Sequence, residues 1–281
     1  MSLRGALMAS AAAIAIMCLG VDAIDTFLGI DPWTLGPETG AVPSLEHPLG
    51  TDELGRDQLS RLLHGGRVSL AVAVLGALIA VSLGTLLGAL AGLAGGWLEG
   101  SLMRMVEIGI ALPKLPFMLL LSGLQGPLGG EGTAVFRLGL IIGVLSWMDV
   151  ARMARAMTRD IRRRPFFRAA EGLGLSSWSL VRLHLVPHLA PTLGVGLALD
   201  VGENVLYESA LSYLGLGVSP PTPSWGTLLA QGLPAARAAP HMVFLPGLLT
   251  VLVVGALHAW VDPARRRGAA DLSNFSTRVP H

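Results

Sequence analysis

Long runs of apolar residues, separated by short polar stretches, form the main pattern along this chain. Six such runs begin near residues 5, 68, 108, 134, 189 and 242. The third run is interrupted between Pro113 and Pro116. A helix needs about 20 mostly apolar residues to cross a bilayer core, and each run comes close to that length. The pattern therefore predicts an all-α membrane protein with six transmembrane helices.

The same pattern divides the chain into four segments. Residues 1–30 are expected to hold the first transmembrane helix, residues 31–67 an extracytoplasmic connection, residues 68–262 a core of five helices, and residues 263–281 a tail. A signal peptide is the alternative for the first run. However, Arg4 is the only positive charge before it, and no clear small-residue cleavage site precedes Asp22. We therefore expect an uncleaved span.

The distribution of arginine predicts the orientation in the membrane. A cluster lies between the fourth and fifth spans, and three more arginines follow the sixth span. Cytoplasmic loops carry an excess of Lys and Arg, so both segments are expected in the cytoplasm, together with both termini and the tail. A nucleic-acid-binding patch is the alternative, but basic clusters beside a span are ordinary topology signals. We expect no nucleic-acid partner.

Composition agrees with a membrane protein and argues against an enzyme. The 281 residues are 52% hydrophobic and 14% charged, with a mean hydropathy of +0.62. The only lysine is Lys114, which follows Pro113, so the chain lacks a phosphate-binding loop. Cys18 is the only cysteine, and Pro187 separates His184 from His188 without an evident third ligand. We predict no catalytic residue, metal site or bound cofactor.

Residues 166–174, followed by residues 181–187, form the most specific motif. They lie in the predicted cytoplasmic loop of about residues 158–188. Five apolar side chains give this otherwise polar loop a surface suited to a buried contact, and Gly174 fits a left-handed helix cap. The five are Phe166, Phe167, Ala169, Ala170 and Leu173. A plain amphipathic helix at the membrane interface is the alternative.

Two further stretches accompany this motif, residues 47–62 after the first span and residues 211–226 at the end of the fifth. Trp225 in the second stretch suits a membrane interface. Together the three stretches resemble the permease subunits of the peptide/nickel family of binding-protein-dependent ABC importers, and in particular the second permease. The resemblance covers roughly residues 46–265. It implies the type I importer permease fold.

The resemblance also implies partners and a site. The partners are a second related permease, two ATPase subunits that use ATP and magnesium, and an extracytoplasmic solute-binding protein, all at the bacterial inner membrane. The ATPase-coupling loop comprises Phe166, Phe167, Arg168, Ala169, Ala170, Glu171, Gly172, Leu173 and Gly174. Arg168 stands where the family usually has its leading glutamate. The acidic contact to the ATPase is therefore left open.

Charged residues within the spans are a second candidate site. Asp200 and Glu203 lie three residues apart and share a helix face. Acidic residues inside a membrane usually face a cavity or a partner, so we expect these two to face the pathway or the other permease. Pairing with Lys114 is the alternative. Glu208 is expected to have a packing role.

Two rival functions follow from the residues alone. A proton-coupled secondary transporter would use Asp149, Asp200 or Glu203 and would need no ATPase. A membrane-embedded enzyme would need a convergent set of catalytic groups, which is missing. Neither rival needs a docking helix in the cytoplasm. The substrate stays open between peptides and a nickel or other metal complex.

Overall fold

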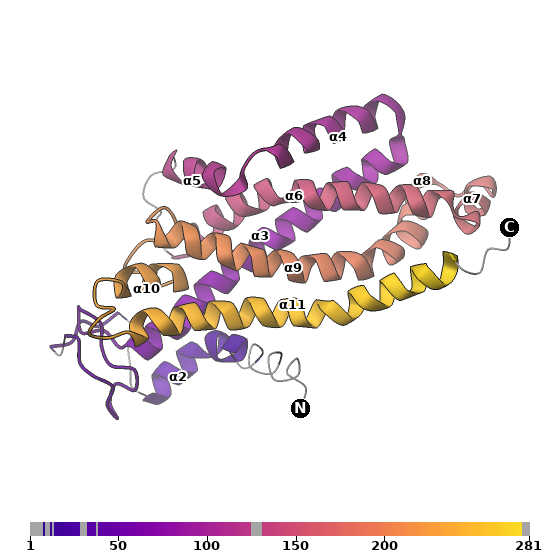
Figure 1. Ribbon diagram of the computed structural model, residues 1–281. Helices are drawn as coiled ribbons and strands as arrows, with labels where there is room; N and C mark the ends of the chain where they lie inside the picture. The colour runs from indigo at the N-terminus through magenta and orange to yellow at the C-terminus, as the bar shows by residue number, and fades with distance from the viewer. Residues whose placement is uncertain are drawn as a thin grey trace.

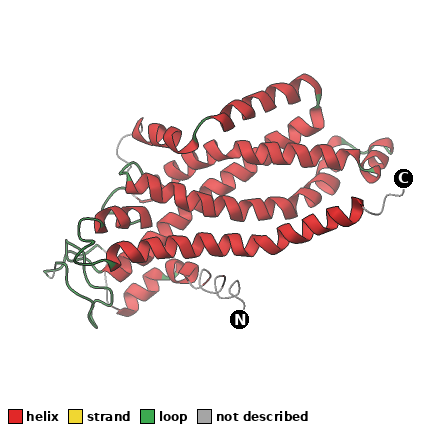
Figure 2. Cartoon of the chain, in the orientation of Figure 1, coloured by secondary structure: helices red, strands yellow, loops and turns green. Residues whose placement is uncertain are grey.

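The computed structural model describes residues 8, 12, 14–28, 33–37, 39–124 and 131–276, without the side chains of residues 27, 28, 177 and 262–276. These residues are helical or in loops, with no strand among them (Figure 2). The helices are α2 (Val21–Leu28), α3 (Gln58–Ala94), α4 (Gly96–Ala111), α5 (Lys114–Leu124), α6 (Glu131–Arg163), α7 (Pro165–Gly172), α8 (Ser177–Leu180), the π-helical turn η1 (Val181–Leu185), α9 (Val186–Tyr213), α10 (Trp225–Gly232) and α11 (His241–Ser276).

Within the described residues, four helical stretches are long and apolar enough to cross a membrane: Gln58–Ala94, Glu131–Arg163, Trp178–Tyr213 and His241–Val261. They run along the length of the molecule, with α7 and α8 at one end and α10 at the other (Figure 1). We call these the α7 end and the α10 end. The chain is thus a membrane protein whose described residues are all-helical and include these four candidate spans. The predicted first span, residues 1–30, lies partly outside the described residues.

The predicted third span is broken into two helices. Helices α4 and α5 meet at an angle of 87°, and counting them as one bent span gives five candidates. The break follows from proline chemistry, because the residue before a proline is pushed out of the helical region. Leu112 precedes Pro113 and is extended, with ψ at 134°. Lys114 therefore begins a new helix rather than continuing the old one.

Helix α3 begins ten residues before the apolar run that predicted it. Asp57 caps its N-terminus by accepting a hydrogen bond from the backbone N–H of Ser60, at 2.9 Å. The first turns carry polar side chains that the connection covers. Residues 58–67 thus form the first turns of α3, whereas the sequence placed them in the connection.

Helices α3 and α6 form the central pair and approach each other closely through glycine. Gly76, Gly84, Gly88 and Gly92 recur on one face of α3. A Cβ atom added to Gly84 would lie 2.6 Å from the carbonyl oxygen of Trp147, and one added to Gly92 would lie 2.8 Å from the Cβ of Thr158. Small residues at four-residue spacing are a common packing device in membranes, where they let two helix backbones meet.

Candidate functional site

Helix α7 has a defined start and a defined end. Pro165 occupies its first turn, where a missing N–H costs nothing. At its end, the N–H of Leu175 donates to the carbonyl of Ala170 at 3.3 Å, and the N–H of Gly174 donates to Glu171 at 3.0 Å. Gly174 has a φ of +77°. This is a Schellman cap, so the fit of Gly174 to a left-handed position is confirmed.

The inner face of α7 packs against its own chain. Phe167 is fully buried and Ala170 is 7% exposed. Both belong to an apolar cluster that also contains Ile161, Leu180, Leu185 and Leu189. These two residues were expected to supply a surface for another protein, and that expectation is wrong. The contact they make is internal, and it fixes α7 on the ends of α6 and α9.

Phe166 lies between the two histidines that were considered as metal ligands. Its ring stacks on that of His188 with centroids 5.1 Å apart, and it meets the ring of His184 at 6.0 Å. Among the described residues, no group of three or more His, Cys, Asp or Glu is placed to hold a metal ion. The histidines therefore help to position α7.

The outer face of α7 and the following turn stay exposed. Leu173 is 82% exposed and Trp178 is 71% exposed, and both lie at the tip of the molecule. Arg168, Ala169, Glu171, Gly172 and Gly174 are exposed as well. The predicted loop is thus divided between an internal face and an external face. Trp178 was not among the predicted residues, although its tryptophan side chain in a polar loop was a usable signal.

Arg162 ties α7 to the central helix pair. Its guanidinium donates to the carbonyl oxygen of Leu93, at the end of α3, at 2.6 Å. It also lies 3.4 Å from the carboxylate of Glu171. A displacement of α7 therefore acts on α3 and α6 together.

A charged cluster gathers where the α4–α5 break meets α6 and α9. The Nζ atom of Lys114 lies 2.7 Å from an Asp149 carboxylate oxygen and 4.0 Å from Glu203. The hydroxyl of Tyr207 donates to Glu203 at 2.5 Å. The structure thus brings Lys114 and Glu203 together, as one sequence alternative proposed. Sequence reasoning missed Tyr207, although it lies one helical turn beyond Glu203.

Asp200 forms no ion pair or side-chain hydrogen bond with the side chains that the structure describes. One of its carboxylate oxygens is buried and has no hydrogen bond within the described part of the chain. The side chains of Asp149 and Glu203 are 40% and 49% exposed on the isolated chain. The cluster therefore opens onto a surface instead of being sealed inside the helix bundle.

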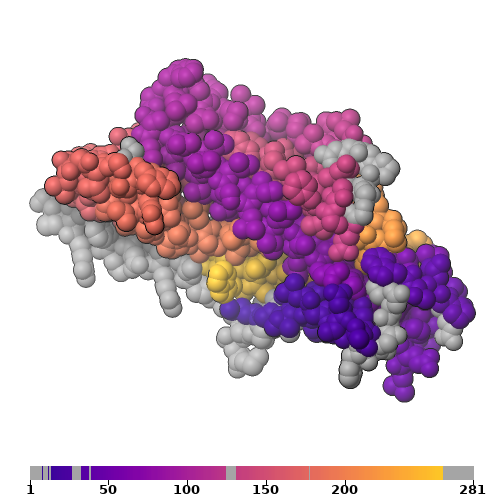
Figure 3. Space-filling view, turned by 180° about the vertical axis from the view of Figure 1, so that it is seen from behind, coloured from indigo at the N-terminus to yellow at the C-terminus, as the bar shows by residue number. Residues whose placement is uncertain are grey.

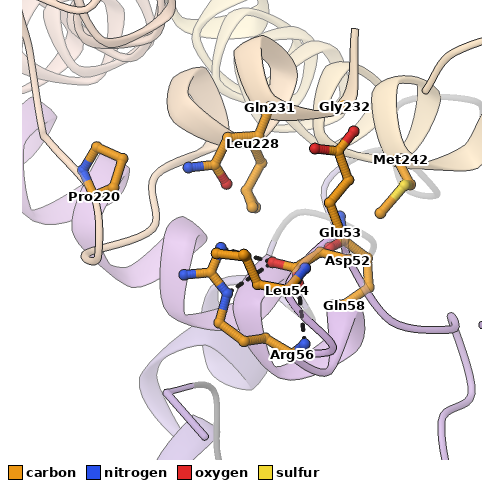
Figure 4. Close-up of a pocket in the computed structure, with 10 residues that line it drawn as sticks. All are labelled: Asp52, Glu53, Leu54, Arg56, Gln58, Pro220, Leu228, Gln231, Gly232 and Met242. Carbon is orange, nitrogen blue, oxygen red and sulfur yellow. Dashed lines mark hydrogen bonds and ion pairs between the residues drawn. The ribbon is translucent and has the colours of Figure 1, made fainter. Parts of the chain in front are cut away.

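The α10 end carries a buried polar network. Asp52 accepts hydrogen bonds from the backbone N–H and the Nε of Arg56, at 3.0 and 2.8 Å. Arg61 is fully buried; it lies 3.4 Å from Asp52 and donates to Gln231 of α10 at 3.0 Å. Figure 4 shows Gln231 of α10 and Glu53 of the connection among the residues that line a cavity beside this network. The network joins the connection to α3 and α10.

Glu208 is enclosed near the same end. It is fully buried, and it accepts a hydrogen bond from Ser212 at 2.7 Å. Trp225 is also fully buried and donates from its backbone to Ser69 and from its indole to Leu62, both at 3.1 Å. Trp225 thus packs inside its own chain, and its level relative to the membrane interface stays a prediction. The position of Glu208 fits the packing role expected for it.

Comparisons with known proteins agree on one family. Residues 84–267 match the model of the binding-protein-dependent transport system inner membrane component. A protein of Brucella suis named as a peptide permease is 36% identical over 227 residues, which cover 80% of this chain and 73% of that protein. The oligopeptide transport system permease protein OppC of Mycobacterium tuberculosis is 34% identical over 231 residues, covering 80% and 78%. This chain therefore belongs to the family of inner membrane components of binding-protein-dependent transport systems, as a permease subunit.

Proposed function

We propose that this chain is one of two related permeases in an ATP-driven importer of the bacterial inner membrane. It has the type I importer fold, with six spans and both termini in the cytoplasm. Arginines of α6, α7 and η1 gather at the α7 end, which the positive-inside rule assigns to the cytoplasm. The α10 end then faces outward, where a solute-binding protein delivers the cargo.

The proposed coupling site is the α7 end, where two ATPase subunits dock below the permease pair. The single observation that carries this proposal is that α7 is buried on one face, whereas the residues that follow it form an exposed apolar tip. Phe167 anchors its inner face, while Leu173 and Trp178 leave an apolar tip exposed. Such a tip in a charged loop is expected to be covered by a partner. The chain itself binds no nucleotide, so ATP and magnesium act in the ATPase subunits.

The proposed pathway lies along the charged cluster of Lys114, Asp149 and Glu203, with Asp200 beside it. Partly exposed charges inside a membrane protein face water or another subunit and not lipid. The names of the relatives favour peptides as cargo. A nickel or other metal complex is the second cargo class that the acidic residues support. A peptide's charged ends and a metal complex would both interact with such a cluster.

Affinity purification of the tagged chain from native membranes tests this proposal. We expect mass spectrometry to identify a second permease and ATPase subunits. The variant Leu173→Asp should lose the ATPase subunits, at least tenfold in recovery, and retain the second permease. Leu45→Asp is the matched control, because Leu45 is exposed like Leu173 but lies in the connection.

Two results would contradict the proposal. Normal ATPase recovery with Leu173→Asp would move the docking site away from the tip of α7. Recovery of the chain alone, with intact folding, would favour the proton-coupled secondary transporter. That alternative predicts transport by the purified chain in a pH gradient, with loss of transport on Asp149→Asn.

A further inference from the structure

A cavity of about 410 Å³ opens at the α7 end, apart from the apolar tip. It lies between the turn that joins α3 to α4, the last turns of α6, and α7. In Figure 3, α4 and the segment that holds α7 lie side by side at this end. Its charged lining consists of Arg159, Arg162, Arg163, Arg168, Glu99 and Glu171. Four cations and two anions therefore face one cavity.

The two glutamates are already engaged by arginine. Glu99 pairs with Arg159 at 3.0 Å and also with Arg155, which approaches from α6. Glu171 lies 3.4 Å from Arg162. The cavity thus keeps an excess of positive charge even when each glutamate neutralises one arginine.

Arg163 and Arg168 carry that excess. Both are exposed, and neither has a hydrogen bond or ion pair with the side chains that the structure describes. They come from different helices, α6 and α7, and line the same cavity. Guanidinium groups with free N–H donors bind phosphate oxygens well, because the planar fork can make two parallel hydrogen bonds. An anion with several oxygens is the ligand that this arrangement fits.

Backbone atoms of the turn between α3 and α4 also line this cavity. Gly95 and Gly96 line the cavity with φ angles of +67° and +58°, and a Cβ on either would meet nothing within 4 Å. Helix α4 begins here without a side-chain cap. Its first N–H groups are thus open to a ligand, and the positive end of its dipole adds to the arginines.

Side chains beside the cavity indicate its depth in the membrane. Trp97 follows Gly96 and is 84% exposed, and Leu98 is 46% exposed. Tryptophan is enriched at the level of the lipid headgroups, and basic cavities between membrane helices on the cytoplasmic side bind anionic headgroups. An anion here would have an apolar neighbour on the side of Trp97, which suits a lipid better than a free phosphate ion.

We propose that this cavity binds the phosphate of an anionic phospholipid headgroup, with Arg163 and Arg168 as its principal ligands and the acyl chains beside Trp97. The bound phosphate would join α6 to α7 and the α3–α4 turn, and so hold α7 in place. This site goes beyond the proposed coupling function, and its binding does not depend on an ATPase. Anionic lipid would therefore act as a structural ligand of the permease.

Native mass spectrometry of the purified full chain tests the proposal, with dioleoyl phosphatidylglycerol and dioleoyl phosphatidylcholine as probes. We expect retention of phosphatidylglycerol over phosphatidylcholine. In the double variant Arg163→Gln/Arg168→Gln, phosphatidylglycerol binding should weaken about tenfold or more. The control Arg104→Gln/Arg182→Gln removes two exposed arginines outside the cavity and should bind normally. The variant Arg163→Lys/Arg168→Lys keeps both charges but loses the planar fork, so it should bind phosphatidylglycerol more weakly than the original chain and more tightly than the double glutamine variant.

The other outcomes each decide one point. Equal binding of both lipids, or equal binding by the double variant and its control, would overturn the site. Complete displacement of phosphatidylglycerol by millimolar inorganic phosphate would retain a phosphate site and overturn lipid as its source. If the double variant binds phosphatidylglycerol normally but loses the ATPase subunits in the purification above, the arginines belong to the protein contact and the lipid proposal fails. Normal ATPase recovery with weakened lipid binding separates this site from the proposed coupling site.

Discussion

The contact between α3 and α6 can be tested with a single added methyl group. In the variant Gly84→Ala, the new Cβ would lie 2.6 Å from both the Trp147 carbonyl oxygen and the Cβ of Val150. Ordinary contact begins near 3.4 Å, so the two helices must separate by several tenths of an ångström along this seam. Overpacking of this kind costs about 1–3 kcal/mol.

A second effect of the same substitution acts in the opposite direction. Alanine favours a helix over glycine by about 1 kcal/mol. Gly100→Ala, in the middle of α4, carries this gain without the overlap, because a Cβ there meets nothing within 4 Å. The difference in unfolding free energy between the two variants therefore isolates the overlap. We expect Gly84→Ala to be less stable than Gly100→Ala by about 1–3 kcal/mol.

Steric trapping of the full chain in lipid bicelles measures these free energies. Gly92→Ala supplies an intermediate case, because its Cβ would lie 2.8 Å from the Cβ of Thr158 and 3.0 Å from the carbonyl oxygen of Arg155, slightly longer contacts than those at Gly84. The expected order of stability is Gly100→Ala, then Gly92→Ala, then Gly84→Ala. If Gly84→Ala proves as stable as Gly100→Ala, the backbones of α3 and α6 are not in close contact, and the argument fails.

Three further substitutions test other contacts by the same measurement. Phe167→Ala removes the central side chain of the cluster beneath α7 and should cost about 3 kcal/mol or more, whereas a smaller loss would place α7 outside the packed core. Asp52→Asn leaves the buried guanidinium of Arg61 without its carboxylate and should cost about 3 kcal/mol; an unchanged stability would mean that water reaches Arg61. Lys114→Met should cost roughly 1 kcal/mol because the cluster is partly exposed, and adding Asp149→Asn should recover that loss.

The apolar runs were enough to predict an all-helical membrane protein, because crossing a bilayer requires a fixed length of apolar helix. They could not predict where α3 begins. Its first turns contain Gln58, Arg61 and His64, which resemble connection residues in sequence. Arg61 and His64 can be buried because Asp52, Asp25 and Gln231 reach them from other parts of the chain. A local hydropathy pattern carries no information about contacts with residues that are distant in the sequence. The glycine spacing on α3, by contrast, is visible in the sequence and marks the face that meets α6.

At the candidate site, the sequence likewise did not show which residues of one short helix face the rest of the chain. The motif around α7 was found from sequence, but its apolar residues were assigned to one external surface. In the structure Phe167 turns inward and Leu173 outward. An eight-residue helix with apolar residues on both sides has too few turns to reveal which side is internal. Likewise, Lys114 and Glu203 were suggested as a pair, but the closer partner Asp149 comes from a third helix.

These contacts also predict how movement at α7 would pass through the proposed importer. Helices α3 and α6 touch at their backbones, so sliding one along the other would separate many contacts at once. Arg162 links α7 to both of them at one end, and Arg61 links α3 to α10 at the other. The α4–α5 break is attached to this pair partly through the exposed ion pair of Lys114 and Asp149. We therefore expect α3 and α6 to move as one body, with the change of contacts concentrated at the charged cluster where the pathway is proposed.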